Sequence, residues 1–144
     1  MDNIRIGLYG IGLNTYWDQF EGLYERLCGY QKIIAEGLAE FSVEVVDAGI
    51  VDEPVKARGA AALFREKMVD AVFLYISTYA LSSTVLPVVQ EAGVPVIVLN
   101  LQPVSHVDYG AFNSLEDRGK KTGEWLAHCQ SCSAPEIASV FNRA

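Results

Sequence analysis

The stretch that decides the fold is Val69-Asp70-Ala71-Val72-Phe73-Leu74-Tyr75-Ile76, followed by Ser77-Thr78-Tyr79-Ala80-Leu81-Ser82-Ser83-Thr84. Its first half is almost uniformly apolar and lacks the alternation of a strand with one solvated face. It therefore predicts a strand buried on both faces of a parallel sheet. The second half is rich in hydroxyl groups. Ligands of open α/β sheets bind beyond the carboxyl ends of the strands, so we expect this loop to hold a polar small molecule.

Working outward, apolar runs alternate with amphipathic segments along the whole chain. Strands are predicted at 4–9, 43–49, 69–76 and 95–101. Helices are predicted from Asn14 or Thr15 to about Phe41, from Pro54 to about Met68, and over 83–92, 115–128 and 134–142. The last is expected to begin at a capping box of Ser133 and Glu136. A long connection without regular structure is expected from Gln102 to about Asn113.

This alternation predicts a single domain over residues 1–144 with a parallel sheet and right-handed crossovers. We expect a flavodoxin-like, doubly wound α/β fold with strand order 2-1-3-4 and helices on both faces. In that order the topological switch lies between the first and third strands. The loops 10–17 and 77–83 should meet there.

Composition narrows the functional class. The chain has 144 residues, 51% of them apolar, and a net charge of −7 without a basic block, so we expect no nucleic-acid partner. No run reaches the length of a membrane-spanning helix, and no secretory signal is recognisable at the N-terminus. We therefore expect a cytoplasmic protein with no membrane partner. Three cysteines do not make a disulfide framework.

Two short motifs have both a structural and a chemical interpretation. Gly10-Ile11-Gly12-Leu13-Asn14-Thr15 resembles half of a dinucleotide fingerprint but lacks its third glycine, and a turn that requires glycine is the favoured interpretation. His128-Cys129-Gln130-Ser131-Cys132 could hold zinc or act as a redox pair. It follows a predicted helix rather than a strand, which favours structural thiols.

Other polar residues give no catalytic set. Most carboxylates fall on solvated helix faces, whereas Glu124, beside Trp125 in an apolar helix, is expected to face a pocket or an interface. The aromatic residues Tyr16, Trp17 and Tyr79 at the switch point could be core residues or could stack on a sugar ring. We assign no catalytic and no metal-ligating residue in this chain.

Several stretches together resemble one known family. They are residues 7–22 (GLYGIGLNTYWDQFEG), 78–87 (TYALSSTVLP), 98–103 (VLNLQP), 122–130 (TGEWLAHCQ), 135–138 (PEIA) and 141–144 (FNRA). These blocks resemble the N-terminal domain of the L-arabinose/L-fucose isomerase family, on its arabinose isomerase-like branch. The resemblance covers nearly the whole chain.

The resemblance implies a domain that closes a neighbouring subunit's active site in a longer, metal-dependent aldose–ketose isomerase. The parent would use Mn²⁺ or a similar divalent metal, held by residues of later domains, so this chain alone would bind no cofactor and be inactive. Its partners would be an aldose or ketose sugar, the remaining domains of the parent, and neighbouring subunits of a homo-oligomer.

The same resemblance places Tyr79 in the sugar pocket and matches Gln130 to a glutamine that reaches the substrate. With the switch-point loops it gives seven expected substrate-binding residues: Tyr79, Gln130, Asn14, Tyr16, Trp17, Thr78 and Gln102. A neutral polyol needs such hydroxyl, amide and aromatic partners. The alternatives are a stand-alone sugar-binding or regulatory module and, less favoured without a phosphate loop, a flavin or nucleotide binder.

Overall fold

The computed structural model describes residues 3–142, so Arg143 and Ala144 of the last resembling block lie outside the described residues. The elements follow one another as β1 (Arg5–Ile11), the short 3-10 helix η1 (Asn14–Tyr16), α1 (Leu23–Ala39), β2 (Glu44–Val51), α2 (Pro54–Glu66), β3 (Ala71–Tyr75), α3 (Ser82–Ala92), β4 (Val96–Leu99), α4 (Tyr109–Ser114), α5 (Arg118–Leu126) and α6 (Gln130–Phe141).

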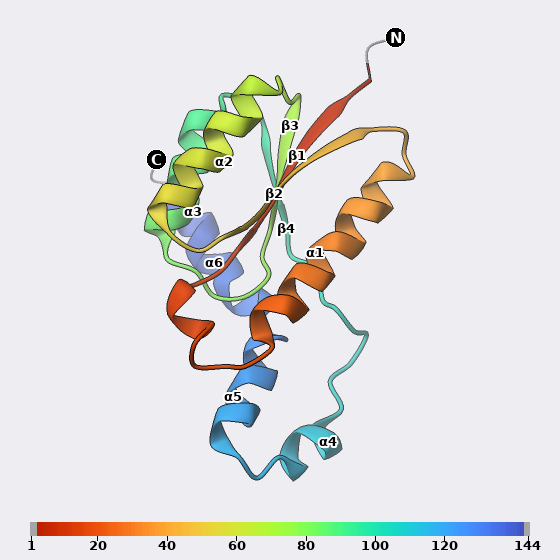
Figure 1. The fold of residues 1–144 in the computed structure, drawn as a ribbon, viewed down its shortest axis with the longest axis vertical. Helices are drawn as coiled ribbons and strands as arrows, with labels where there is room; N and C mark the ends of the chain where they lie inside the picture. The colour runs from red at the N-terminus through yellow and green to blue at the C-terminus, as the bar shows by residue number, and fades with distance from the viewer. Residues whose placement is uncertain (1–2, 143–144) are drawn as a thin grey trace.

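The four strands form one parallel sheet in the order β2-β1-β3-β4, as predicted. Gly7 of β1 lies opposite Val46 on one side and Val72 on the other. The carboxyl ends of the strands point to the same edge, and the α4–α5 pair projects beyond that edge (Figure 1). The fold is consistent with the flavodoxin-like class, and its switch point lies between β1 and β3.

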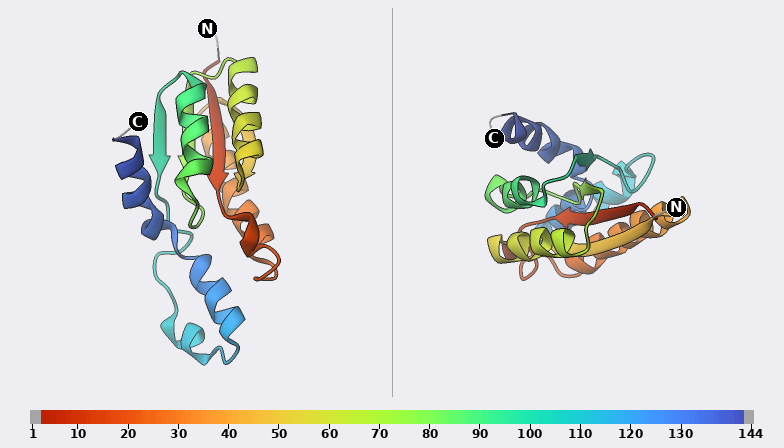
Figure 2. Two further views of the ribbon diagram at one scale, coloured as in Figure 1. Left: turned by 90° about the vertical axis from the view of Figure 1, so that its left-hand side faces the viewer. Right: turned by 90° about the horizontal axis from the view of Figure 1, so that it is seen from above.

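Helices cover both faces of the sheet. The helices α2 and α3 lie side by side on one face, with α6 next to α3 (Figure 2). The apolar cluster on this face includes Phe64 of α2, Val88 of α3 and Ile137 of α6, each at most 2% exposed. The helix α1 packs on the other face, where Leu27 and Ile50 join Leu126 of α5.

The central strand β3 has the predicted environment fully on one face, where Val72, Leu74 and Ile76 are buried, and in part on the other, where Tyr75 is buried but Ala71 and Phe73 are half-buried. The last strand does not. Its sequence is equally apolar, yet Ile97 and Val98 are 46% and 37% exposed. The strand β4 pairs only with β3 and lies at the edge of the sheet, so part of its surface has no helix over it.

The first long helix begins later than predicted. Asn14 or Thr15 was expected to cap it, but residues 14–16 form a separate 3-10 turn and α1 begins at Leu23. The break is at Gly22, whose φ of +76° is favourable for glycine and costly for other residues. The chain therefore makes a loop between β1 and α1, and this loop adds to the carboxyl edge.

The C-terminal third also differs from its predicted segmentation. A short helix, α4, forms inside the expected connection because the Asp108 carboxylate accepts from the Ala111 amide at 3.0 Å. Asp117 likewise caps α5, accepting from Lys120 N at 2.7 Å, so that helix begins after Leu115. The capping box was wrong: α6 begins at Gln130, and Ser133 is buried within it.

The glycines at the end of β1, Gly10 within the strand and Gly12 just after it, leave space for neighbouring side chains rather than forming a turn. Gly10 lies within β1, where an added Cβ would be 2.6 Å from Ile50 Cδ1 and would also overlap the Gln31 amide. A Cβ on Gly12 would be 2.8 Å from the Trp17 ring. Neither glycine has a positive φ. Close packing of neighbouring side chains, not backbone conformation, therefore explains why glycine occupies both positions.

Among the described helices, none combines the length and hydrophobicity required to cross a bilayer.

Candidate functional site

The loop after β3 is anchored to the corner between α5 and α6. The Thr78 hydroxyl donates to the Leu126 carbonyl at 3.0 Å, and the Gln130 amide donates to the carbonyls of Ser77 at 3.0 Å and Ala127 at 2.8 Å. Ser133 donates to the Thr78 carbonyl at 3.3 Å. Segments almost fifty residues apart in sequence therefore form one buried polar junction at the carboxyl edge.

The seven predicted site residues differ in accessibility. Thr78 and Gln130 are fully buried in this junction, although the Gln130 Oε1 atom has no partner among the described residues. Gln130 also lies beside the Tyr75 hydroxyl, whose pKa is raised to about 12 chiefly by burial. Gln102 is exposed and donates to Ser131 Oγ at 2.7 Å.

The remaining predicted residues lie on the switch-point loops. Asn14 is exposed, and Tyr16 and Tyr79 are half-buried neighbours: burial first, then the nearby Tyr79 and Cys129, raise the pKa of Tyr16. The polar atom of Trp17 is used in a hydrogen bond within the domain. Its indole N–H donates to the buried Asp52 carboxylate at 2.7 Å, and Lys56 Nζ lies 2.8 Å from the same carboxylate.

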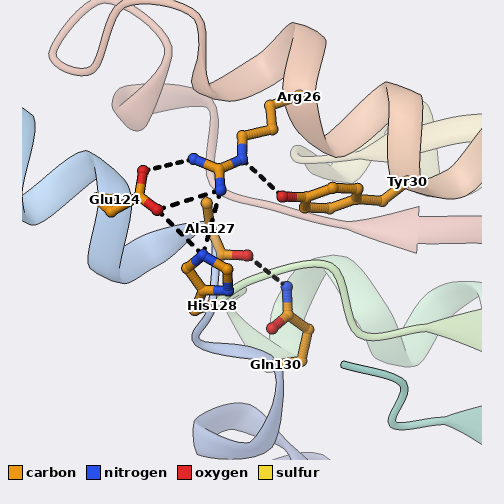
Figure 3. A network of polar contacts seen from close by, with 6 residues as sticks. All are labelled: Arg26, Tyr30, Glu124, Ala127, His128 and Gln130. Carbon is orange, nitrogen blue, oxygen red and sulfur yellow. Dashed lines mark hydrogen bonds and ion pairs between the residues drawn. The ribbon is translucent and has the colours of Figure 1, made fainter. Parts of the chain in front are cut away.

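A second polar group lies between α1 and α5 (Figure 3). The Arg26 guanidinium donates to Glu124 through two bonds, of 2.6 Å from Nη1 and 3.2 Å from Nη2, and Nε donates to the Tyr30 hydroxyl at 2.6 Å. His128 Nε2 lies 3.2 Å from Arg26 Nη2 and 3.1 Å from Glu124 Oε1. Which of those two bonds forms depends on the tautomer of the ring.

The ionised state of this pair is favoured. The hydrogen bond from Arg26 lowers the pKa of Glu124 despite its partial burial, and His128 lowers it further. The hydrogen bond to Glu124 raises the pKa of Arg26 in turn. A two-pronged arginine–carboxylate pair fixes both side chains in one geometry. Arg26 and Glu124 are therefore a rigid pair of opposite charges beside the cavity described next.

This pair lines a cavity of about 500 Å³ between the loop before α1 and the start of α5. The size is within the range of small-molecule sites. Its polar lining carries two cationic residues, Arg26 and Lys120, and three acidic ones, Glu21, Asp117 and Glu124, around the ring of Phe20. Such a lining offers donors, acceptors and an apolar surface without a strong net charge.

A smaller cavity of about 190 Å³ lies on the other side of Glu124. It is lined by Tyr109, Phe112 and Trp125 together with His128. Glu124 therefore lies between two cavities, in agreement with the expectation that this residue faces a pocket. None of the seven predicted sugar-binding residues lines either of these two cavities.

Sequence reasoning did not find Arg26, Phe20, Asp117 or Lys120. Arg26 and Lys120 look like ordinary residues on solvated helix faces, and 98 residues separate Arg26 from Glu124. The only local signal was an acidic residue beside an apolar helix face, and it pointed to Glu124. The cavity depends on the loop that ends at Gly22, just before α1. The sequence prediction placed these residues inside one continuous helix and therefore contained no such loop.

The described residues do not fit the manganese ion that the family resemblance implies for the parent. Mn²⁺ prefers several carboxylate or imidazole donors. Across residues 3–142 no group of three or more His, Cys, Asp and Glu side chains could hold a metal ion. The nearest approach, Glu124 with His128, already holds the Arg26 cation, which would repel a metal ion.

Comparison with known proteins does not identify a family for this chain. No family model matches the sequence, and no curated protein matches it.

Proposed function

We propose that this chain is the sugar-contacting N-terminal domain of a metal-dependent aldose–ketose isomerase of the L-arabinose/L-fucose type. The observation that carries the proposal is the cavity at the carboxyl edge of the sheet, beside the fixed Arg26–Glu124 pair. A neutral polyol has hydroxyls that donate and accept together with an apolar ring face. The cavity supplies these donors and acceptors mainly as charged groups, rather than as the hydroxyls and amides expected from the sequence, together with the Phe20 ring.

In this proposal the chain binds and orients sugar, and residues of the later domains hold the metal and move protons. Arg26 and Lys120 donate to sugar oxygens, while Glu124 and Asp117 accept from sugar hydroxyls. None of Tyr79, Asn14 and Tyr16 lines the cavity, so in this proposal they contact the part of the substrate that extends out of it toward the switch-point loops. Thr78 and Gln130 act by fixing those loops, because their polar groups are bonded to backbone carbonyls.

The proposal also includes partners along the open edge of the sheet. Apolar side chains at and after β4 are exposed, among them Ile97, Leu101 and Val104, each close to 45%. The backbone of β4 is paired on one side only. We assign this surface to the remaining domains of the parent chain, with neighbouring subunits of the homo-oligomer closing over the cavity.

A second candidate is a stand-alone sugar-binding or regulatory module. Like the first candidate, it is compatible with the cavity and its mixed polar and apolar lining. Both candidates place the sugar in the same cavity. They differ in whether metal-dependent isomerisation is carried by further domains of the same polypeptide.

Calorimetric titration of the chain with L-arabinose, L-fucose and FMN tests the shared claim. A handful of hydrogen bonds, each worth about 0.5–1.5 kcal/mol, predicts sugar binding with a Kd of about 1 mM. FMN should bind more weakly than either sugar, because no phosphate-binding loop is recognised in the sequence and acidic residues slightly outnumber basic ones in the lining. Tight FMN binding with no response to either sugar would contradict the proposal and favour a nucleotide binder.

A further inference from the structure

The two cysteines of the Cys129-Gln130-Ser131-Cys132 segment lie in the first turn of α6. Cys129 is the N-cap residue, and the Cys132 amide donates to the Cys129 carbonyl at 3.2 Å. Residues three apart in a helical turn have Cα atoms about 5 Å apart. A disulfide requires about 4.4–6.8 Å between Cα atoms, so the Cα separation within this turn permits a bond between the two sulfurs.

The two thiols differ in their access to solvent. Cys132 is exposed, whereas Cys129 is only 2% exposed. Burial, and then the neighbouring Cys132 sulfur, raise the pKa of Cys129 to about 12. The buried thiol therefore stays protonated, and only the Cys132 thiol is open to reagents in solution. One accessible thiol beside one protected thiol is the arrangement of an attacking and a resolving cysteine.

A metal site does not explain the pair. No third Cys, His, Asp or Glu joins it within residues 3–142. His128 is adjacent in sequence, but it does not complete a metal-binding group with the two sulfurs, and its Nε2 atom faces Arg26 and Glu124. The third cysteine, Cys28, lies on α1 and contacts Tyr24. Within the described residues, each of these two thiols therefore has the other as its neighbouring cysteine.

We propose that Cys129 and Cys132 form a reversible dithiol–disulfide site that reacts with low-molecular-weight disulfides such as oxidised glutathione. The Cys132 thiolate attacks one sulfur of the small disulfide, forms a mixed disulfide and releases one thiolate. The Cys129 thiol then gives up its proton to water, and the thiolate so formed attacks the Cys132 sulfur of the mixed disulfide and expels the second small thiolate. The protein dithiol loses two electrons, and one small disulfide is reduced to two thiols.

The position of the pair connects this chemistry to the carboxyl edge. Gln130 lies between the two cysteines, and its amide donates to the Ser77 and Ala127 carbonyls. Ser131, the next residue, accepts from Gln102. The disulfide would therefore close around the turn that anchors the loop after β3. The proposal does not depend on which ligand binds at that edge.

Incubation of the intact chain with oxidised glutathione tests the proposal, with non-reducing peptide mapping and mass spectrometry as the readout. The wild-type chain should lose two hydrogen atoms in mass and yield a linked Cys129–Cys132 peptide that dithiothreitol reverses. The Cys129→Ser variant should stop at a stable glutathione adduct on Cys132. The matched control Cys28→Ser should form the same disulfide as the wild type.

A persistent glutathione adduct on wild-type Cys132, with Cys129 still alkylatable after denaturation, would overturn the proposal. A disulfide that involves Cys28 would also overturn it. The exposed substitution Cys132→Ser covers the case in which Cys129→Ser fails to fold. In Cys132→Ser the folded chain should leave Cys129 free of glutathione, and an adduct on Cys129 would show that the buried thiol is the attacking one.

Discussion

The face of the sheet under α2 and α3 and the edge between α1 and α5 are built by different interactions. The first is a continuous apolar cluster in which Phe64, Val88 and Ile137 are almost fully buried. The second has a smaller apolar cluster of Leu27, Ile50 and Leu126, and beside it the Arg26–Glu124 pair and its hydrogen bonds line an open cavity. Apolar burial under α2 and α3 stabilises the domain, whereas the edge between α1 and α5 keeps polar groups available to a ligand. We therefore expect substitutions in the two regions to separate stability from binding.

The largest effect on stability should come from Phe64→Ala. The ring fills the space above Gly7, where an added Cβ would lie 2.8 Å from it, and its centroid is 6.2 Å from that of Tyr9. Its loss should lower the free energy of unfolding by about 3–5 kcal/mol. Urea denaturation measures the change, with the exposed Phe41→Ala as the control, expected within about 0.5 kcal/mol of the wild type.

In the fraction of Phe64→Ala that remains folded, sugar affinity should match the wild type. A stability loss below 1 kcal/mol would show that the α2 face does not hold the domain together in the way that its burial indicates.

An intermediate effect is expected for Gln130→Ala, which lies at the boundary of the two regions. Removal of the amide leaves the buried carbonyls of Ser77 and Ala127 without their donor, at a cost of about 1–3 kcal/mol. Thermal unfolding should show a lowered midpoint. The exposed Gln102→Ala is the matched control, and its free energy of unfolding should stay within about 0.5 kcal/mol of the wild type, so that its midpoint barely moves. Equal midpoints for the two variants would show that the Gln130 hydrogen bonds do not stabilise the junction.

The smallest effect on stability should come from Glu124→Gln, because its ion pair is partly solvated. We expect a loss of about 1 kcal/mol at neutral pH. Since Arg26 lowers the pKa of Glu124 on folding, the pair stabilises the folded state fully above the ordinary value of 4.5. The contribution disappears as pH falls through the lower, folded value.

The difference in stability between wild type and Glu124→Gln should accordingly shrink on acidification below about pH 4.5. Denaturation at a series of pH values measures it. Glu36→Gln, which removes an exposed 3.8 Å pair with Lys32, should show almost no difference at any pH. A Glu124 effect that grows in acid would contradict the ion-pair account.

The contrast between the two regions also explains what could be predicted from sequence. The apolar run before Ser77 indicates a buried strand by itself, and four apolar runs with helices between them indicate a parallel sheet, for which the predicted order 2-1-3-4 is confirmed. Apolar periodicity does not record where a helix breaks. The predicted start of α1 was too early because Gly22, with its positive φ, ends one segment and begins the next.

The charged edge is harder to predict because its contacts join distant residues. Arg26 and Glu124 come together only once α1 and α5 are placed. The acidic Asp108 and Asp117 carry a local capping signal that predicts a helix start, but neither indicates a cavity. Similarly, the exposure of β4 follows from its position at the edge, which its apolar sequence does not reveal.

The most direct test of the central claim is a titration of the ¹⁵N-labelled chain with L-arabinose or L-fucose, followed by NMR at each amide. If the cavity between α1 and α5 binds the sugar, the resonances of Gly22, Gly119 and Gly123 should move with one saturating curve. Gly59 on α2 should not move, and Glu124→Gln should weaken the response about tenfold or more. Shifts confined to residues outside the cavity, or an unchanged affinity in Glu124→Gln, would contradict the account.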